Sequence, residues 1–232
     1  MAHTTFTQLP NVLPSYLRAS LKPRASLQPG ASLPRLSASW QDATFDKADV
    51  ERYRNLCRLP CSNDDNIVPL LYPHAMLGPL HLYLLSHPKF PIGLVGSVHL
   101  RNHVVQYFPL SVKEPFCVQL QLSEGRRRPQ GFEVDLTQEI SVGGRTCWSS
   151  VSTFLARQHK CDTADAESPL ASSVARIAGE RHRLGSFPIP PETGVAFGHL
   201  TKDINPIHMS KFLARLFGFE RDLIHGLWAV GR

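Results

Sequence analysis

The spacing of hydrophobic positions changes character along the chain. Over residues 46–59 apolar side chains recur at three- and four-residue intervals, which predicts a short amphipathic helix. Residues 69–86 are apolar all round, as in a buried helix, and Pro79 within them predicts a kink or a late helix start. Beyond Pro91 apolar and polar residues alternate, which predicts strands. These strands are expected over residues 97–108, 116–122, 132–140 and 146–154.

Turn-forming residues separate the predicted strands. The breaks GRRRPQG (125–131) and SVGG (141–144) suit antiparallel connections. We interpret the arginine run 126–128 as a solvated hairpin tip, with an anion site as the alternative. A buried helix followed by several antiparallel strands predicts an α+β fold in which the sheet wraps the helix.

The predicted domain spans residues 41–157. The segments on either side of it differ from it in composition. Residues 1–40 contain basic residues and serines but no acid, which indicates an extended N-terminal arm or a mitochondrial transit peptide. Residues 158–182 are polar and rich in small side chains, so we interpret them as a linker. A loop of that length inside a compact domain is uncommon, which places a domain boundary there.

The chain contains a faint internal repeat. LYPHAMLG (71–78) resembles DLIHGLWAV (222–230), with His74 opposite His225, and upstream Tyr53 matches Phe197. The second copy carries the extra polar segment KDINPIHM. This indicates that the first copy has a structural role and that the second carries the function. Only seven residues follow His225, against about eighty residues of strand pattern after His74. We therefore expect the second unit, 183–232, to be truncated in this chain.

Composition narrows the class of protein. An apolar fraction of 42% in 232 residues excludes a mostly disordered chain, and no run approaches the roughly 18 apolar residues of a membrane span. A net charge of +6 does not require nucleic acid as a partner. Five cysteines without a C-x-x-C pair indicate free thiols in a reducing compartment. We expect a cytoplasmic protein, or a mitochondrial one if the arm is a transit peptide.

The residues that carry chemistry lie near the C-terminus. Asp203 and His208 are separated by Asn205 and Pro206, and the proline disfavours helix at Asn205. The carboxylate and the imidazole can therefore converge from a short loop and hold one water, as addition of water to a carbon–carbon double bond requires. Taken alone, D-x-N-P is more often a helix-capping turn. The backbone N–H of Gly226, at a helix start, is suited to an oxyanion.

The same segment matches a two-part motif. It resembles the hydratase-2 signature of the MaoC-like enoyl-CoA hydratase and 3-hydroxyacyl dehydratase family, aromatic-x-x-[ST]-x-D-x-N-P-[IL]-H followed by [IV]-x-H-G-[ML]. The matching residues are Thr201, Asp203, Asn205, Pro206, Ile207 and His208, then Ile224, His225, Gly226 and Leu227. One departure is Lys202, where family members often have glycine or an acid.

The resemblance implies a double hot-dog fold, with a degenerate half at 41–157 and a catalytic half beginning at 183. It implies reversible hydration of trans-2-enoyl thioesters to (3R)-3-hydroxyacyl thioesters in fatty-acid metabolism, with no metal and no redox cofactor. By the resemblance, Asp203 and His208 are the catalytic pair and Asn205 supports the loop and its water. The N–H of Gly226 would then polarise the thioester carbonyl.

Competing interpretations remain at this point. A hot-dog fragment that binds acyl-CoA or a partner subunit without catalysis is the main alternative. A nucleotide-binding enzyme and a serine hydrolase are disfavoured, because the chain has no G-x-x-x-x-G-K-[ST], G-x-G-x-x-G or G-x-S-x-G motif. The expected partner is a substrate linked to CoA or to an acyl carrier, with no nucleic acid and no membrane. The oligomeric state stays open, with a homodimer as one arrangement.

Overall fold

Two compact units make up the fold. The computed structural model describes residues 2–21, 33–60, 64–93, 97–157, 164–168, 170–171, 186–216 and 218–232. The first unit comprises Met1–Ala43, Leu80–Phe108 and Phe116–His182, and the second comprises Thr44–Pro79, Pro109–Pro115 and Arg183–Arg232. Because the units interleave along the chain, they divide it differently from the domains predicted at 41–157 and 183–232. Those sequence boundaries stay a prediction, and most of the predicted linker 158–182 lies outside the described residues.

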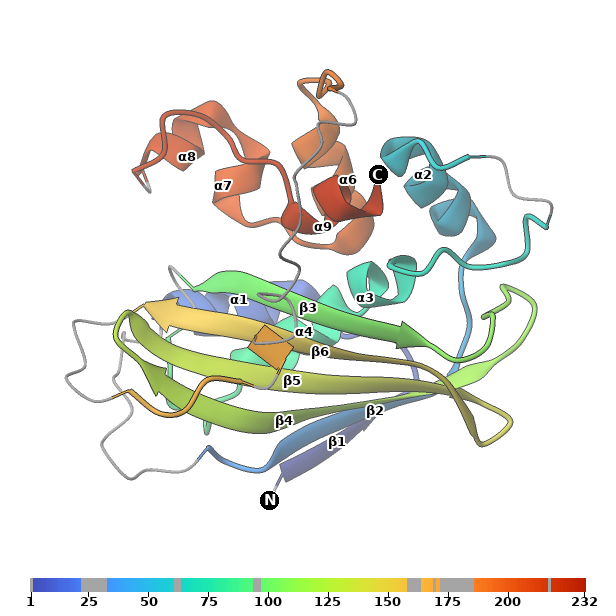
Figure 1. Cartoon of the computed structure of the whole chain (residues 1–232), viewed down its shortest axis with the longest axis horizontal. Helices are drawn as coiled ribbons and strands as arrows, with labels where there is room; N and C mark the ends of the chain where they lie inside the picture. Colours follow the sequence, from blue (N-terminus) through green and yellow to red (C-terminus); the bar gives the residue numbers. More distant parts are fainter. Residues whose placement is uncertain are drawn as a thin grey trace. The chain divides into compact units, whose positions relative to one another are not determined.

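The first unit is built on a six-stranded sheet in the order β1-β2-β4-β5-β6-β3 (Figure 1). Its strands are β1 (Ala2–Phe6), β2 (Leu36–Ala43), β3 (Val98–Gln106), β4 (Phe116–Arg128), β5 (Gly131–Val142) and β6 (Arg145–Arg157). Strand β1 runs parallel to β2, and the other neighbours pair antiparallel. The four strands predicted from alternation are confirmed as β3 to β6.

The two hairpins of the sheet differ in how well the sequence predicted them. Strands β5 and β6 are joined through Gly143 and Gly144, whose φ values of 55° and 80° suit a two-residue turn between antiparallel strands. Strand β4 runs through all three arginines to Arg128, which pairs with Gly131. The interpretation of the arginine run as a solvated hairpin tip is therefore wrong, since these residues belong to the strand.

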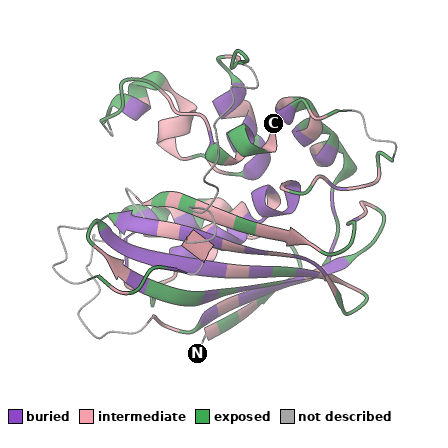
Figure 2. Cartoon of the chain, viewed as in Figure 1, coloured by how far each residue is buried: buried purple, intermediate pink, exposed green. Residues whose placement is uncertain are grey.

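One face of the sheet packs on helix α4 (Gly78–Leu85), as predicted for a sheet that wraps a helix. Burial follows the alternation, and β5 is covered along most of its length (Figure 2). A polar contact crosses this core: His81 Nε2 lies 2.8 Å from Gln138 Oε1, and Gln138 Nε2 donates to Ser152 Oγ at 2.8 Å. The apolar side chains of this face are Ala38, Trp40, Val118, Leu120, Leu122, Leu136, Ile140 and Trp148.

The opposite face of the sheet carries buried charges. Arg126 is only 7% exposed, and its Nη2 lies 2.5 Å from Asp135 Oδ2. Glu133, also buried, lies 3.5 Å from Arg126 Nε and 2.8 Å from Arg101 Nη2. Burial disfavours the charge on Arg126, but the hydrogen bond that it donates to Asp135 and the charges of Asp135 and Glu133 outweigh burial and raise the pKa of the guanidinium.

The N-terminal segment is not uniformly extended. It contains β1, helix α1 (Val12–Leu21) and the start of β2, where an extended arm was expected over residues 1–40. Pro14 and the serines indicated an extended chain, but a proline in the first turn of a helix is tolerated because its missing N–H has no intrahelical partner there.

The second unit consists of short helices. They are α2 (Lys47–Cys57), α3 (Tyr72–Met76), α6 (Thr193–Thr201), α7 (Pro206–Met209), α8 (Lys211–Leu216) and α9 (Gly226–Gly231). The helix predicted at 46–59 is confirmed as α2, and Asp46 caps it by accepting a hydrogen bond from Asp49 N at 3.1 Å. The helix predicted over 69–86 is broken at Leu77 into α3 and α4, as Pro79 indicated.

The two copies of the internal repeat contact each other in this unit. Tyr53 of α2 and Phe197 of α6, matched in the sequence, have ring centroids 6.0 Å apart. Trp228 of α9 donates from Nε1 to the carbonyl of Leu56 at 2.8 Å, which fastens α9 to α2. The matched helices therefore share one core, and this supports the repeat.

Two further sequence inferences bear on the environment of the protein. None of the described helices is long and apolar enough to cross a membrane. Cys57, Cys117 and Cys147 are free thiols, as expected, whereas Cys61 and Cys161 lie outside the described residues.

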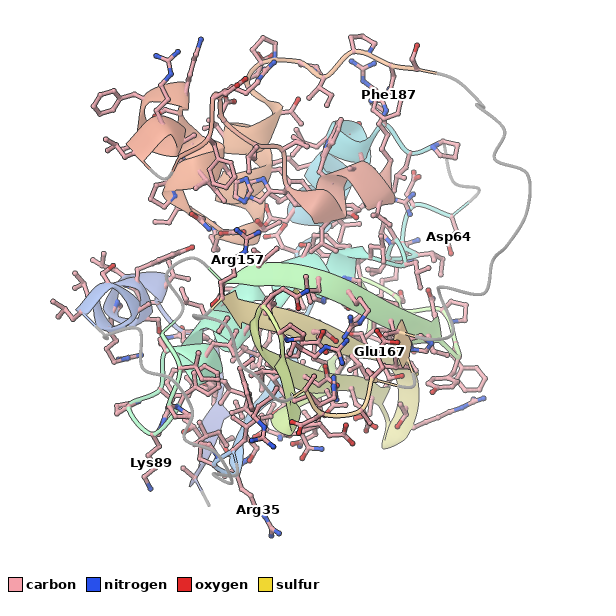
Figure 3. All side chains as sticks on the ribbon, turned by 60° about the vertical axis from the view of Figure 1, so that its left-hand side comes forward. Arg35, Asp64, Lys89, Arg157, Glu167 and Phe187 are labelled. Atoms are coloured by element: carbon pink, nitrogen blue, oxygen red, sulfur yellow. The ribbon has the colours of Figure 1, made fainter. Side chains whose placement is uncertain are left out.

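Replacing Arg126 by methionine should strongly destabilise the protein. The substitution keeps much of the side-chain volume but leaves Asp135 buried without its cation, and it removes one of the cations beside Glu133, which keeps Arg101. Removing one partner of a buried ion pair typically costs about 3–5 kcal/mol. The measurement is the free energy of unfolding in urea. Arg157→Met, at an exposed arginine that ends β6 in the same sheet (Figure 3), should change it by less than about 0.5 kcal/mol. Equal losses in the two variants would contradict the ion-pair account.

Stability should fall as the pH drops through the range set by His81. Burial is the main cause that lowers the pKa of His81 to about 4, against about 6.5 for a free imidazole. Above pH 6.5 the ring of His81 is neutral in both the folded and the unfolded chain, so burying it costs no protonation energy and the free energy of unfolding has its full value. Between 6.5 and 4 only the unfolded chain binds the proton, and up to about 3 kcal/mol is lost.

Urea unfolding measured from pH 7.5 to pH 4.5 checks the expected loss. His81→Gln removes one titrating group and can still hydrogen bond, so it should make the decline shallower by the share that His81 contributes. His103→Gln, at an exposed histidine of β3, should leave the decline unchanged. A decline that is as steep in His81→Gln as in the wild type would refute the assignment.

Candidate active site

The loop that carries the site is shaped by its own side chains. Helix α6 ends at Thr201, and Lys202 caps it with a left-handed φ of 59°, a conformation that favours glycine. Asp203 Oδ1 then accepts a hydrogen bond from Asn205 N at 3.3 Å. Asn205 in turn caps α7 by accepting from Ile207 N at 3.4 Å, with Pro206 as the first helical residue. D-x-N-P is thus a capping turn, and the turn itself places Asp203 and His208.

The tautomer of His208 is fixed by a backbone carbonyl. Its Nδ1 lies 2.8 Å from the oxygen of Leu223, which can only accept, so Nδ1 carries the proton. A second backbone bond, from Leu223 N to Ile207 O at 2.9 Å, ties the same two segments together. Atom Nε2 of His208 is consequently left with a lone pair that can take up a proton.

A third residue, His225, completes the cluster. Its ring stacks on His208 with centroids 3.8 Å apart, and its Nε2 lies 3.6 Å from Asp203 Oδ2. One donor atom from each of Asp203, His208 and His225 lies within 4.8 Å of the other two. The structure therefore brings Asp203 and His208 together, as predicted, and adds an imidazole between them.

Burial sets the charge state of His225. The side chain is 5% exposed, whereas that of Asp203 is 45% exposed. Burial and the nearby His208 lower the pKa of His225 to about 4, although Asp203 acts in the opposite direction, so the ring is neutral at pH 7. Among the described residues, its Nδ1 is buried and has no hydrogen-bond partner.

Two glycines of α6 allow this close packing. A Cβ at Gly198 would lie 2.7 Å from the carbonyl oxygen of Asp203 and 3.4 Å from the ring of His225. A Cβ at Gly194, one turn earlier, would lie 2.9 Å from the carbonyl oxygen of His208. The loop therefore rests directly on the helix backbone, which no larger residue would permit.

The remaining predicted residue, Gly226, begins helix α9. It is exposed, and its N–H is one of the four that a helix start leaves without an intrahelical partner. His225, directly before it, is the N-cap residue of the same helix, which the hydrogen bond from Trp228 to the carbonyl of Leu56 attaches to α2.

The first copy of the repeat preserves half of this arrangement. Asp64 Oδ1 accepts from Asn66 N at 2.9 Å, as Asp203 accepts from Asn205, and it lies exposed in the loop after α2 (Figure 3). Five residues beyond Asp64 stands Pro69, where the second copy has His208. The first copy thus has the carboxylate turn without the imidazole.

The site contains residues that the sequence alone did not assign. His225 was part of the matched motif, but only its neighbour Gly226 was given a role. Gly194 and Gly198 were not singled out, although their four-residue spacing on one helix face is a usable signal for close packing.

Comparison with known proteins places the chain among dehydratases. No protein-family model matches it. It is 29% identical over 221 residues to 3-hydroxyacyl-thioester dehydratase X of Mycobacterium tuberculosis, across 95% of this chain and 76% of the relative. A crystal structure of HtdX from M. tuberculosis superposes with a TM-score of 0.67 at 28% identity, covering 83% of this chain and 74% of the other. A MaoC-like dehydratase from Phytophthora capsici shares the fold, with a TM-score of 0.62 at 14% identity over 87% of this chain and 72% of the other.

These relatives confirm the predicted fold and support the resemblance given by the motif. The architecture, a long antiparallel sheet around a helix, is a hot-dog fold. In sequence and fold the chain is similar to MaoC-like hydratases and dehydratases.

Gly198→Ala should destabilise the loop and the helix together. The added Cβ would meet the carbonyl oxygen of Asp203 at 2.7 Å, so backbone must shift. Such overpacking typically costs about 1–3 kcal/mol. The control is Gly226→Ala, where the Cβ meets nothing within 4 Å. Urea unfolding should show a loss in the first variant and a change below about 0.5 kcal/mol in the second. A Gly198→Ala protein as stable as wild type would contradict the close packing.

Proposed function

We propose that this chain catalyses the reversible dehydration of (3R)-3-hydroxyacyl thioesters to trans-2-enoyl thioesters in fatty-acid metabolism. The observation that carries the proposal is the convergence of Asp203 and His208 on one partly exposed spot. Their capping turn belongs to a motif characteristic of the family. The name of the M. tuberculosis relative, a 3-hydroxyacyl-thioester dehydratase, supports the same reaction.

The reaction needs a base and an acid on one face of the substrate. Hydration requires that a water lose a proton as it attacks the β carbon and that the α carbon gain one. His208 holds an unprotonated Nε2, and Asp203 has one carboxylate oxygen engaged by the turn and the other facing His225. The two groups can therefore hold one water between them and exchange its protons with the substrate.

The neighbouring residues have supporting roles in this proposal. Asn205 holds Asp203 and the start of α7 in place. The neutral ring of His225 fills the space behind the pair and sets the position of Asp203. The N–H of Gly226 would polarise the thioester carbonyl, so that charge developing on its oxygen is stabilised.

The proposed chemistry consists of proton transfers, so we propose that it needs no metal and no redox cofactor. Turnover should consequently survive treatment with a chelator. The proposed partner is an acyl thioester carried by CoA or by an acyl carrier, and the proposed location is the cytoplasm.

Asp203→Asn and His208→Ala should each abolish most of the turnover. A positioned acid or base contributes ~10²–10⁴-fold, and Asp203→Asn keeps the turn while it removes the charge, so a loss near the upper end is expected. The double variant should lose little more, because the two groups act as one unit. The measurement is the change in enoyl-thioester absorbance with a short-chain enoyl-CoA, at saturating and limiting concentrations.

The first copy of the repeat offers a matched control. Asp64→Asn with Asp65→Asn changes the equivalent turn, which lacks the histidine, and should leave turnover within a few-fold. If both site variants fold and keep near wild-type turnover, the catalytic assignment is wrong and non-catalytic acyl-thioester binding takes its place.

A further inference from the structure

The candidate active site has the donor set of a transition-metal site. Two imidazoles and one carboxylate, from His208, His225 and Asp203, present ligand atoms within 4.8 Å of one another. Two histidines with a carboxylate suit Zn²⁺ and similar ions, whereas Mg²⁺ and Ca²⁺ prefer oxygen ligands. We propose that this cluster binds a single Zn²⁺ ion and that the bound ion inhibits the enzyme.

One of the two histidines, His208, is held as zinc ligands usually are. A ligating histidine generally donates its other ring N–H to a carbonyl or carboxylate, which fixes the ring and raises its basicity. His208 donates from Nδ1 to the carbonyl of Leu223 and keeps Nε2 for a metal. His225 is 5% exposed, its Nε2 lies 3.4 Å from the carbonyl oxygen of Asp203, and its Nδ1 has no hydrogen-bond partner among the described residues. To bind zinc through Nε2, this ring would give up the contact with the carbonyl and carry its proton on Nδ1.

Zinc binding would require one imidazole ring to tilt, because the rings of His208 and His225 stack at an interplanar angle of 29° and their lone pairs lie in the ring planes. The distances between the ligand atoms need a smaller change. Zinc bonds of about 2.0–2.2 Å in a tetrahedral site place neighbouring ligand atoms roughly 3.3 Å apart. His225 Nε2 and Asp203 Oδ2 are already 3.6 Å apart. The side chain of Asp203 is 45% exposed, so Oδ2, the carboxylate oxygen that faces His225, lies at the edge of the core. Three protein ligands would leave a fourth position for water.

A zinc ion in this position would prevent the proposed reaction. It would use the lone pairs of Asp203 and His208 that the proton transfers require, and it would occupy the place of the reacting water. This inhibition rests on the proposed dehydratase function, whereas the binding of zinc does not. Zinc and the thioester should therefore compete, and a chelator should restore turnover.

Calorimetric titration of the full chain tests the binding by itself. The protein, first treated with EDTA and exchanged into buffer, should bind one ZnCl₂ per chain, and MgCl₂ should give no signal. Asp203→Asn and His208→Ala should each weaken zinc binding by more than about 100-fold, because even the outer partners of zinc ligands contribute ~10–100-fold. His199→Ala, at an exposed histidine of α6 outside the cluster, should bind as wild type.

Cobalt gives an independent readout. CoCl₂ should produce visible absorption bands in the wild type that disappear in both ligand variants, with circular dichroism showing that the variants are folded. The proposal is overturned if the wild type binds no zinc, or if the folded ligand variants bind it as tightly as His199→Ala. If zinc binds as expected but the protein shows no dehydratase activity, the metal site stands and the proposed function fails.

Discussion

The candidate site depends on the contact between the backbone of helix α6 and the loop that follows it. At Gly194 and Gly198 the helix has no side chains, so the carbonyls of His208 and Asp203 come within reach of its main chain. This contact brings the loop back along the helix that precedes it. His225 then fits against the same helix at Gly198 and stacks on His208. Without the two glycines, the three side chains would have no common place to meet.

The repeat explains why one half of the chain can serve as support for the other. Both copies keep an Asp-x-Asn turn and a buried histidine, His74 in the first and His225 in the second. Only the second copy has a histidine five residues after the aspartate. Because the matched helices pack on each other through Tyr53 and Phe197, the first copy contributes to the core even where it has lost the chemistry.

The sequence predicted most of the sheet and the catalytic loop, for reasons visible in particular residues. Strands β3 to β6 alternate clearly, and D-x-N-P-x-H is local, so its geometry follows from a few neighbouring dihedral angles. Strand β2 was not predicted because its core residues, such as Ala38 and Trp40, stand among serines. The burial of Arg126 and the approach of His225 to Asp203 depend on partners far along the chain, which local patterns do not contain.

The two-residue turn at Gly143 and Gly144 has a consequence for how this sheet can change over evolutionary time. It fixes the pairing of β5 with β6, and successive residues of β5 point to opposite faces. One residue inserted within β5 between Leu136 and the turn, with the pairing at the turn kept, would direct Glu133 and Asp135 toward helix α4 and Leu136 toward the arginines. Both faces of the sheet would then be mismatched, so length changes within this strand can be tolerated only in pairs, whereas the turn itself can lengthen.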